Sequence, residues 1–303
     1  MTTFGFSTTA DEVLAGVDLT DRRALVTGAT SGVGVETARA LAAHGAAVVL
    51  GVRNVEAGER IAAQLKESTG NGSVTVGRLD LSDLGSVRSF TAEWDGPLDL
   101  LINNAGIMAT PELTRTPEGH ELQFAVNYLG HFALTTGLYP ALAHSGRSRI
   151  VSLSSNAHLF APFSFDDYDY LFRQYDPVTA YGESKTATAL LAVEADRRWA
   201  TDGIRANAVH PGAIATNLQQ HTGGLRTPAE RRKTVEQGAA TSVFAAASPL
   251  VERIGGRYFE DCAEAELRTE RPPLFGGGVA PFALDPANAS RLWDLGERLL
   301  ATV

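Results

Sequence analysis

Two residues four positions apart, Tyr181 and Lys185, could together transfer a proton. They lie in an apolar pattern of helical period over 180–201, and residues at this spacing share one face of a helix. Free tyrosine has a pKa of about 10, which a fixed ammonium group nearby would lower toward the working range by stabilising the phenolate. The pair is therefore a candidate general acid and base. The spacing alone is weak support, because such pairs occur by chance in many helices.

A glycine-rich loop near the start of the chain could hold an anion. An apolar strand pattern over 23–27 leads into glycines at positions 28, 32 and 34, and a helical pattern over 34–44 follows. Gly28 would permit a tight turn, while the missing side chains at Gly32 and Gly34 would let a pyrophosphate approach the amides at the start of the helix. Glycines often only mark a turn, but this place between the first strand and the first helix favours a dinucleotide site.

The end of the second strand pattern indicates which dinucleotide that would be. A fold that prefers NAD usually places a carboxylate roughly 20 residues after the glycine loop, where it binds the ribose 2′-hydroxyl. Residues 50–54 hold no carboxylate, and Arg53 is placed to pair with a 2′-phosphate through its planar guanidinium. A solvated loop charge is the alternative role for Arg53. The segment predicts NADP(H) as the cofactor.

These residues must be positioned by a regular alternation of strands and helices. Strand patterns are expected over 23–27, 46–51, 73–79, 98–103, 149–153, 205–210 and 257–260. Helical patterns separate most of them, over 34–44, 55–68, 82–94, 180–201 and 228–247. This alternation with right-handed crossovers predicts an α/β fold with a single doubly wound parallel sheet, Rossmann-type, of about seven strands with helices on both faces.

The candidate residues fall within one large domain, expected over 19–260 and preceded by an N-terminal arm of residues 1–18. Residues 156–178 form an insertion rich in aromatic residues and aspartate, and loops of that length usually act as lids or binding segments. Residues 213–248 are expected to form a helical region on the substrate side. A C-terminal extension, 261–303, is expected to pack on the same domain and to end in a helix near 290–300.

The bulk composition limits the partners of the chain. A net charge of -9 at pH 7 argues against nucleic acid and against an anionic membrane surface, because phosphate binding uses basic patches. Cys262 is the only cysteine, so an intramolecular disulfide is excluded and a reducing, cytoplasmic location is favoured. No secretory signal is expected, and no apolar run approaches the roughly 18 residues that span a bilayer. We expect a soluble protein with a small-molecule substrate.

A metal site is not expected. His131, His158 and His210 do not show the spacing of metal ligands, so we expect structural roles for them, with a place in the substrate loop as the alternative for His158. The aspartates of 166–169 are expected to form an exposed acidic loop rather than a cation site.

Seven motifs in the same order make the chain resemble the short-chain dehydrogenase/reductase family. They lie between about 19 and 260, and they are Thr27-Gly28 with Gly32 and Gly34, Asp80-Leu81, Asn103-Asn104-Ala105-Gly106, Asn127, Ser155, Tyr181 with Lys185, and Pro211-Gly212. The segment 52–54, the long insertion and the segment 256–259 resemble the retinol-dehydrogenase and protochlorophyllide-reductase branch. The resemblance implies an oxidoreductase that uses NADP(H).

The resemblance also implies a cofactor contact for each motif. Asp80 would bind the adenine amino group beside the Leu81 amide, and the residues after the fourth strand would line the adenine ribose and support the sheet. Those after the sixth strand would meet the nicotinamide carboxamide and the pyrophosphate. The expected cofactor contacts are Gly28, Ser31, Gly32, Val33, Gly34, Arg53, Asp80, Leu81, Asn104, Ala105, Gly106, Tyr181, Lys185, Pro211, Gly212, Ile214 and Thr216.

The expected catalytic residues are Asn127, Ser155, Tyr181 and Lys185. Tyr181 would act as the general acid or base on the substrate oxygen, and Ser155 would polarise that oxygen. By resemblance, Asn127 would hold a water that links Lys185 to solvent. Ser154 competes with Ser155 for its role, and Ser155 is preferred because the second serine of the pair is the active one in the family.

Three functions stay open at this point. The favoured one is NADPH-dependent hydride transfer to or from a carbonyl or alcohol group of a small, apolar or ring-containing substrate, which the aromatic insertion would suit. Reduction of a conjugated C=C bond is the nearest alternative, and a non-catalytic protein that senses NADP is the third. Family members are often dimers or tetramers joined through the helix that bears Tyr181, and the C-terminal extension could support or block that interface.

Overall fold

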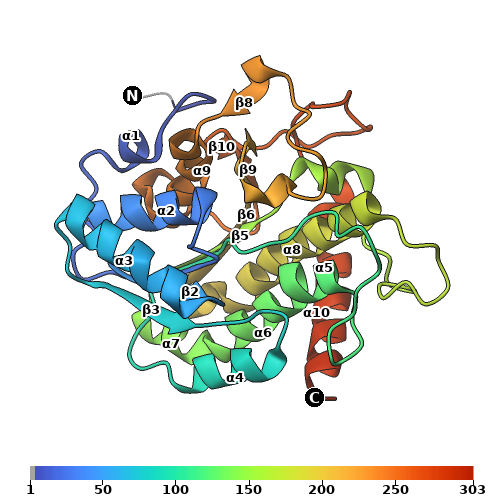
Figure 1. Cartoon of the computed structure of the whole chain (residues 1–303), viewed down its shortest axis with the longest axis horizontal. Coiled ribbons are helices and arrows are strands. Elements are labelled where there is room, and N and C mark those ends of the chain that lie inside the picture. The colour runs from blue at the N-terminus through green and yellow to red at the C-terminus, as the bar shows by residue number, and fades with distance from the viewer. Residues whose placement is uncertain (1–3, 303) are drawn as a thin grey trace.

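An eight-stranded sheet forms the centre of the computed structural model, which describes residues 4–302 (Figure 1). The strands follow the order β10-β9-β6-β5-β4-β1-β2-β3. Their bounds are β1 Arg23–Thr27, β2 Ala47–Val52, β3 Val74–Arg78, β4 Leu100–Asn103, β5 Ser148–Leu153, β6 Ile204–His210, β9 Tyr258–Glu260 and β10 Ala263–Glu264. All neighbours are parallel except β10, which pairs antiparallel with β9. The predicted Rossmann-type parallel sheet is confirmed, with β10 as an additional edge strand.

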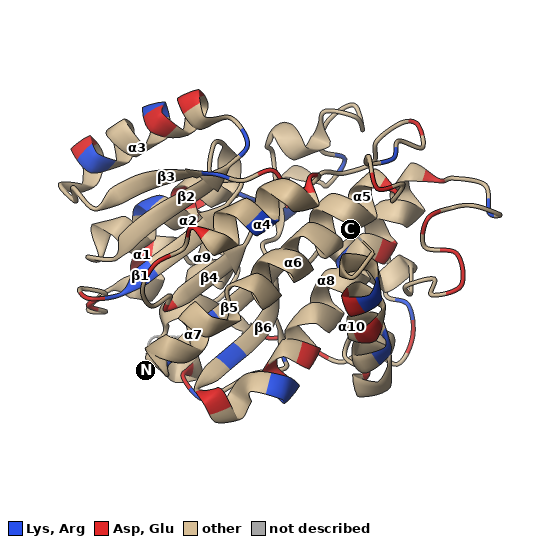
Figure 2. Ribbon diagram, turned by 90° about the horizontal axis from the view of Figure 1, so that it is seen from below, with Lys and Arg blue, Asp and Glu red and all other residues tan. Residues whose placement is uncertain are grey.

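Helices cover both faces of this sheet. On one face, the core contains residues of α2 (Gly32–Ala43), α3 (Val55–Thr69) and α9 (Val235–Ala247), with α1 (Ala10–Leu14) against α9. On the other face it contains residues of α4 (Leu84–Ala92), α6 (Gly130–Gly137), α7 (Tyr139–Ser145) and α8 (Pro177–Trp199). The last helix, α10 (Pro286–Leu300), lies against the outer side of α8 (Figure 1). Charged residues lie along α3 and α10 (Figure 2).

Side-chain caps set where the helices begin. Asp176 accepts a hydrogen bond from the Thr179 amide, so α8 begins at Pro177, three residues before the predicted start. Thr234 forms a capping box with Gln237, so α9 begins at Val235. The prediction that this helix spans 228–247 was therefore wrong for residues 228–234, where 232–233 instead forms the strand β8 (Arg232–Lys233), paired with β7 (Ala213–Ile214).

The segment between β4 and β5 contains helices that the sequence pattern did not delimit. A short helix α5 (Leu122–Phe124), a π-helical turn (Ala125–Leu129) and α6 follow one another without a break. Most of their residues are buried, so they lack the alternation of apolar and polar faces on which prediction from the sequence depends. A π turn in the middle of a helix often marks a functional position.

Aromatic packing holds α10 on the body of the protein. Trp293 is 3% exposed, and its ring meets Phe132 of α6 and Trp199 of α8 edge-on, at centroid distances of 5.0 and 5.1 Å. Its indole nitrogen donates to Glu297 at 2.7 Å. The Tyr128 hydroxyl donates to the backbone of Leu292 at 2.9 Å. The outer side of the helix that bears Tyr181 is therefore covered by the chain's own C-terminal helix.

We expect Trp293→Ala to lower the free energy of unfolding by about 3–5 kcal/mol, because it leaves a large cavity between three helices. Urea unfolding followed by fluorescence or circular dichroism measures the change. Arg298→Ala, on the exposed side of the same helix, serves as the control and should change stability by less than about 0.5 kcal/mol. If Trp293→Ala changed the free energy of unfolding as little as Arg298→Ala does, α10 would contribute little to the stability of the fold.

Candidate active site

The ends of the central strands bring the predicted residues to one edge of the sheet. Thr27, which ends β1, pairs with Gly51, and Asn103, which ends β4, pairs with Ser152. The strand order changes direction between β1 and β4, and ligands of such sheets bind outside the carboxyl ends of the strands at that point. The glycine loop, the turn after β4, Ser155 after β5 and the Pro211-Gly212 turn after β6 all lie along this edge.

Tyr181 and Lys185 come to this edge on α8. Both are buried, at 6% and 4% exposure. The Lys185 ammonium donates to the carbonyl of Leu153 at 2.8 Å and lies 5.7 Å from the centre of the Tyr181 ring. Gly182 between them allows close packing, because a Cβ there would be 2.7 Å from the carbonyl oxygen of Ala157. The helix is thus held tightly against the segment that carries Ser155.

Burial controls the ionisation of the pair. Burial raises the pKa of Tyr181 to about 12, and a hydrogen bond with Ser155 acts in the opposite direction. Burial lowers the pKa of Lys185 to about 8. The expectation that Lys185 brings the tyrosine pKa down to the working range is therefore not met in this structure, because loss of hydration outweighs an ammonium 5.7 Å from the ring. At neutral pH the phenol is protonated and the ammonium charged.

The two neighbouring serines have different partners. Ser154 is 3% exposed and donates to the carbonyl of Lys185 at 2.7 Å, so it supports α8. The Ser155 oxygen accepts the Ala157 amide at 3.2 Å, and the Ser155 side chain lies near enough to the Tyr181 phenol to act on its pKa. The geometry therefore favours Ser155 over Ser154 as the hydroxyl that would meet a substrate oxygen next to the phenol.

Asn127 lies in the π turn and is fully buried. Its side chain accepts the Ile107 amide at 2.9 Å and donates to the Ile107 carbonyl at 3.0 Å and to the Ser184 hydroxyl at 2.9 Å. A Cβ at Gly106 would be 3.2 Å from the Asn127 side-chain oxygen and 3.3 Å from the Lys185 ammonium. Asn127 thus holds the turn after β4 against the catalytic lysine candidate.

The glycine loop touches two other predicted cofactor segments. Gly28 has a φ of +69°, and a Cβ there would be 2.8 Å from the Cα of Ala105. Gly32 has a φ of +59°, and its Cβ would be 3.0 Å from the Thr216 side chain. Ser31 precedes α2 and makes no capping hydrogen bond with its side chain. The glycine loop, the turn after β4 and the segment after β6 that holds Thr216 therefore form one continuous backbone surface.

Several of the remaining predicted cofactor contacts pack against other parts of the protein. The Asn104 amide nitrogen donates to the Thr27 carbonyl at 2.7 Å, so this side chain supports the turn. A Cβ at Gly238 of α9 would be 2.7 Å from Ile214 and 3.3 Å from Val33, which places both beside the helix start. Gly212, with a φ of +97°, packs over the Lys233 side chain.

Arg53 and Asp80 lie at the other end of the same edge. Arg53 is exposed after β2, and within residues 4–302 its guanidinium pairs with no carboxylate. Asp80 follows β3 and accepts hydrogen bonds from the amide and hydroxyl of Ser82, at 3.0 and 2.6 Å. Since β1 and β4 lie between β2 and β5, an extended molecule is needed to reach from Arg53 to Tyr181.

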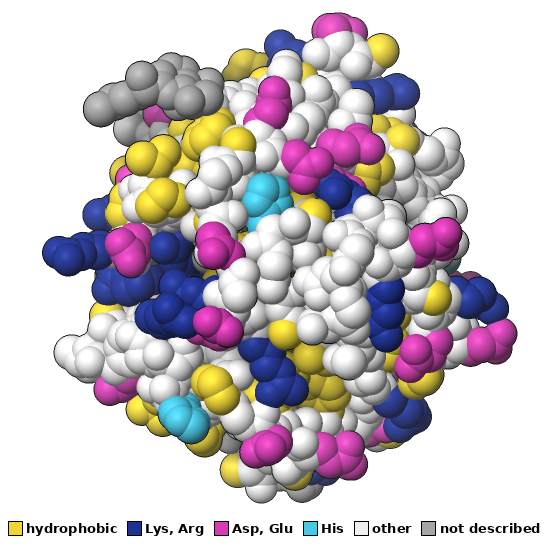
Figure 3. Space-filling model, turned by 90° about the vertical axis from the view of Figure 1, so that its left-hand side faces the viewer, with side chains coloured by type: hydrophobic (Ala, Val, Ile, Leu, Met, Phe, Trp, Pro, Cys, Tyr) yellow, Lys and Arg dark blue, Asp and Glu magenta, His cyan; other side chains and the backbone are white. Residues whose placement is uncertain are grey.

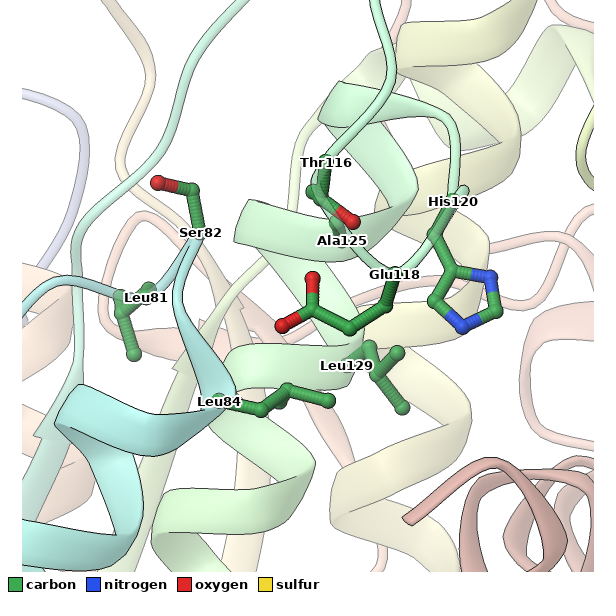
Figure 4. Close-up of a pocket in the computed structure, with 8 residues that line it drawn as sticks. All are labelled: Leu81, Ser82, Leu84, Thr116, Glu118, His120, Ala125 and Leu129. Atoms are coloured by element: carbon green, nitrogen blue, oxygen red, sulfur yellow. The ribbon is translucent and has the colours of Figure 1, made fainter. Parts of the chain in front are cut away.

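Leu81 borders a small hollow on this side (Figure 4). Leu81 and Ser82 form one wall, and Thr116 and His120 from the connection before α5 line the opposite part. Ala125 and Leu129 of the π-helical turn lie between them. The predicted adenine end and the turn that carries Asn127 therefore share one packed boundary.

The aromatic residues of the insertion pack mainly against the protein. The Phe163 ring lies 5.5 Å from Phe124 and 5.0 Å from Phe165. Arg173 makes two hydrogen bonds to Glu183, at 2.7 and 3.0 Å, on the far side of α8 from Tyr181. These rings anchor the insertion, so they supply no direct argument for a flat aromatic substrate.

The C-terminal extension reaches the active-site edge, which the sequence did not indicate. Asn156 donates to the Gly276 carbonyl at 3.3 Å, and the Ala280 amide donates to the ring of His158 at 3.2 Å. Both contacts lie within three residues of Ser155. The run of glycines at 276–278 was the one available signal of a close approach of the backbone.

His131, His158 and His210 are neutral in this arrangement. Burial lowers the pKa of His131 and His158 to about 4 and that of His210 to about 3. Within residues 4–302, no cluster of histidine, cysteine, aspartate and glutamate has the arrangement of a metal site. No helix in that range is long and apolar enough to cross a membrane.

One face of the surface mixes basic, acidic and apolar side chains (Figure 3).

Comparison with known proteins identifies the family. Residues 22–224 match the short chain dehydrogenase family. The chain is 51% identical over 296 residues to a protein of Streptomyces antibioticus named "Probable oxidoreductase", covering 92% of this chain and 98% of that one. It is 37% identical over 300 residues to human retinol dehydrogenase 14, covering 90% and 84%. The chain belongs to the short-chain dehydrogenase family, in its retinol-dehydrogenase-like branch, and is an oxidoreductase of that family.

Solved structures give the same result. An uncharacterised Mycobacterium paratuberculosis protein superimposes with a TM-score of 0.76 at 36% identity, covering 97% of this chain and 98% of that one. A gluconate 5-dehydrogenase from Burkholderia cenocepacia, solved with NADP and tartrate, has a TM-score of 0.65 at 25% identity, covering 82% and 95%.

Proposed function

We propose that the protein is an NADP(H)-dependent oxidoreductase that transfers a hydride to or from a carbonyl or alcohol carbon of a small, apolar or ring-containing substrate. The observation that carries the proposal is the meeting of Tyr181, Lys185 and Ser155 at the sheet edge that also bears the glycine loop. Proton transfer groups and a pyrophosphate cradle on one edge are what hydride transfer to a carbonyl requires.

In the proposed reaction, NADPH would, when bound, be the source of the hydride that the carbonyl carbon receives. The Ser155 hydroxyl holds the carbonyl oxygen beside the Tyr181 phenol. As negative charge develops on that oxygen, Tyr181 gives it the phenolic proton, and the alcohol is complete. The charged Lys185 then stabilises the resulting phenolate until a proton returns. Because the Tyr181 pKa is about 12, the phenol is the stable form at neutral pH, which favours reduction there and oxidation at higher pH.

The cofactor assignment rests on the two ends of the sheet edge. The backbone of the glycine loop and the start of α2 would hold the pyrophosphate, with Ser31 and Thr216 beside it. Asp80 and Leu81 would meet the adenine, and Pro211, Gly212 and Ile214 the nicotinamide. The gluconate 5-dehydrogenase solved with NADP supports this preference by similarity.

The substrate class is the least restricted part of the proposal. Human retinol dehydrogenase 14 is a relative over most of the chain, which favours an apolar alcohol or its carbonyl. A conjugated enone would fit the same donor arrangement if the hydride went to the β-carbon of the C=C bond and Tyr181 supplied the proton for the α-carbon. We would measure NADPH oxidation with a panel of ketones, aldehydes, quinones and enones. No turnover of any carbonyl or enone, with NADPH bound, would favour a cofactor-sensing protein and overturn the proposal.

We expect Arg53→Ala to remove the preference for NADPH. The ratio of kcat/KM with NADPH to that with NADH should fall roughly 10- to 100-fold, because a charge-assisted hydrogen bond to the 2′-phosphate is worth about 1.5–3 kcal/mol. Arg88→Ala, an exposed residue of α4, is the matched control and should leave the ratio unchanged. Equal losses with both cofactors would argue against the 2′-phosphate role of Arg53.

A further inference from the structure

We propose that His131 is a positioning residue whose neutral ring couples the cofactor side of the site to its proton-transfer side. His131 is 1% exposed and lies in α6, four residues after Asn127. Its Nδ1 is 3.0 Å from the Asn127 carbonyl oxygen, and its Nε2 is 2.9 Å from the Thr27 hydroxyl oxygen. The inference rests on the proposed function and assigns a role there to a residue that does not touch substrate.

Counting donors and acceptors at Thr27 fixes the direction of these hydrogen bonds. The Thr27 hydroxyl oxygen accepts the amides of Asn104 and Ala105, both at 2.9 Å, which uses its two lone pairs. Its proton must then go to His131 Nε2 at 2.9 Å or to the Ile102 carbonyl at 3.3 Å. The shorter contact assigns the proton to Nε2. His131 therefore carries its own proton on Nδ1 and donates it to the Asn127 carbonyl.

The link keeps this form across the pH range of an assay. Burial lowers the pKa of His131 to about 4, and the nearby charge of Lys185 acts in the same direction. The polar groups that face the ring from β1 and β4 are the Thr27 hydroxyl and, through it, the amides after β4, none of which titrates. A neutral ring with one donor and one acceptor is therefore the form present above about pH 5.

Each end of the ring controls a different part of the site. Through Thr27 it holds the amides of Asn104 and Ala105, and Ala105 packs directly against Gly28 of the cofactor loop. Through Asn127 it holds the turn that lies against the Lys185 ammonium. The ring thus sets the separation between the cofactor loop and the lysine, and hydride transfer is sensitive to errors of that kind.

Two substitutions separate the ends of the ring. Asparagine can place its amide nitrogen near the Nδ1 position, so His131→Asn keeps the bond to Asn127 and loses the one to Thr27. We expect the Kd for NADPH to rise about tenfold, as for one lost hydrogen bond, with kcat at saturating NADPH within about twofold of wild type. Glutamine reaches the Nε2 position, so His131→Gln should leave the Kd near wild type and lower kcat roughly tenfold.

The measurements are NADPH fluorescence titration, kcat at saturating NADPH and thermal unfolding. His144→Gln, an exposed histidine of α7, is the matched control and should change none of them. Thr27→Val removes the same link from the β1 side, and should weaken NADPH binding at least as much as His131→Asn. It keeps the test decisive if either His131 variant folds poorly.

The two ideas fail in different ways. A purely structural His131 would lower the Tm of both variants and leave the Kd and kcat unchanged, and this result would overturn the coupling role alone. The same would follow if both variants changed the Kd and kcat alike. A wild-type protein that does not bind NADPH would overturn the proposed function and the coupling role together.

Discussion

Tyr181→Phe will bind NADPH with a Kd close to that of the wild type and will lose turnover roughly a thousandfold. Phenylalanine keeps the ring that α8 buries but lacks the hydroxyl proton that, in the proposed mechanism, passes to the substrate oxygen. Since the Tyr181 pKa is about 12, the wild-type phenol carries its proton at neutral pH, so the substitution removes a proton donor that is present under assay conditions. Stopped-flow NADPH oxidation and fluorescence titration measure the two quantities separately.

The control for this substitution is Tyr139→Phe. Tyr139 lies in α7, and its hydroxyl donates to Asp202 at 3.0 Å, away from the sheet edge that carries the site. It loses the same single oxygen, and should keep full activity. Wild-type turnover by Tyr181→Phe would refute the assignment of the general acid, and a matching loss of NADPH affinity would show that the hydroxyl serves the cofactor instead.

Lys185→Met should lower kcat at least about a hundredfold and yet raise stability near neutral pH. The drop in pKa from 10.5 to about 8 shows that the folded protein holds this charge at a cost of roughly 3 kcal/mol. Losing the hydrogen bond to the Leu153 carbonyl takes back about 1 kcal/mol. A gain in the free energy of unfolding of about 2 kcal/mol at pH 7 is therefore expected.

The pH dependence gives this prediction a sign that can be checked. Between about pH 8 and 10.5 the unfolded chain keeps a proton on Lys185 that the folded protein has released, so wild-type stability from this group rises with pH. The advantage of Lys185→Met should accordingly shrink toward pH 10. Urea unfolding of both proteins at pH 7 and at pH 9.5 measures it. A mutant that is less stable than wild type at pH 7 would mean that the buried ammonium does not carry this cost.

The sequence predicted the parts of the fold that have a regular pattern. The strands from β1 to β6 lie within two residues of their expected bounds, because continuous apolar runs mark strands covered on both faces. The segment 122–145 was not delimited, because helices buried on most sides have no amphipathic period. The start of α9 could have been found, since Thr234 and Gln237 have the spacing of a capping box.

For the site, the motifs predicted which residues would meet, but not how each one is engaged. Tyr181, Lys185 and Ser155 were expected together and lie together. The pKa of Tyr181 was expected in the wrong direction, because the extent of burial is a property of the folded protein and not of a four-residue spacing. The contacts of Asn156 and His158 with the C-terminal extension join residues far apart in the sequence, and the glycines at 276–278 indicate a close backbone approach without naming its partner.

Those contacts also affect the order in which the protein can be completed during its synthesis. The hydrogen bonds that Tyr128 and Asn156 donate to the extension, and the one that His158 accepts from it, join residues that are 164, 120 and 122 positions apart. The ribosome makes the sheet strands β1 to β6 first, and domains begin to fold from the N-terminal side. A nascent chain can therefore assemble its dinucleotide-binding sheet while the wall beside Ser155 is still missing. Synthesis of residues 276–300 is then the step that both covers α8 and adds the wall beside Ser155.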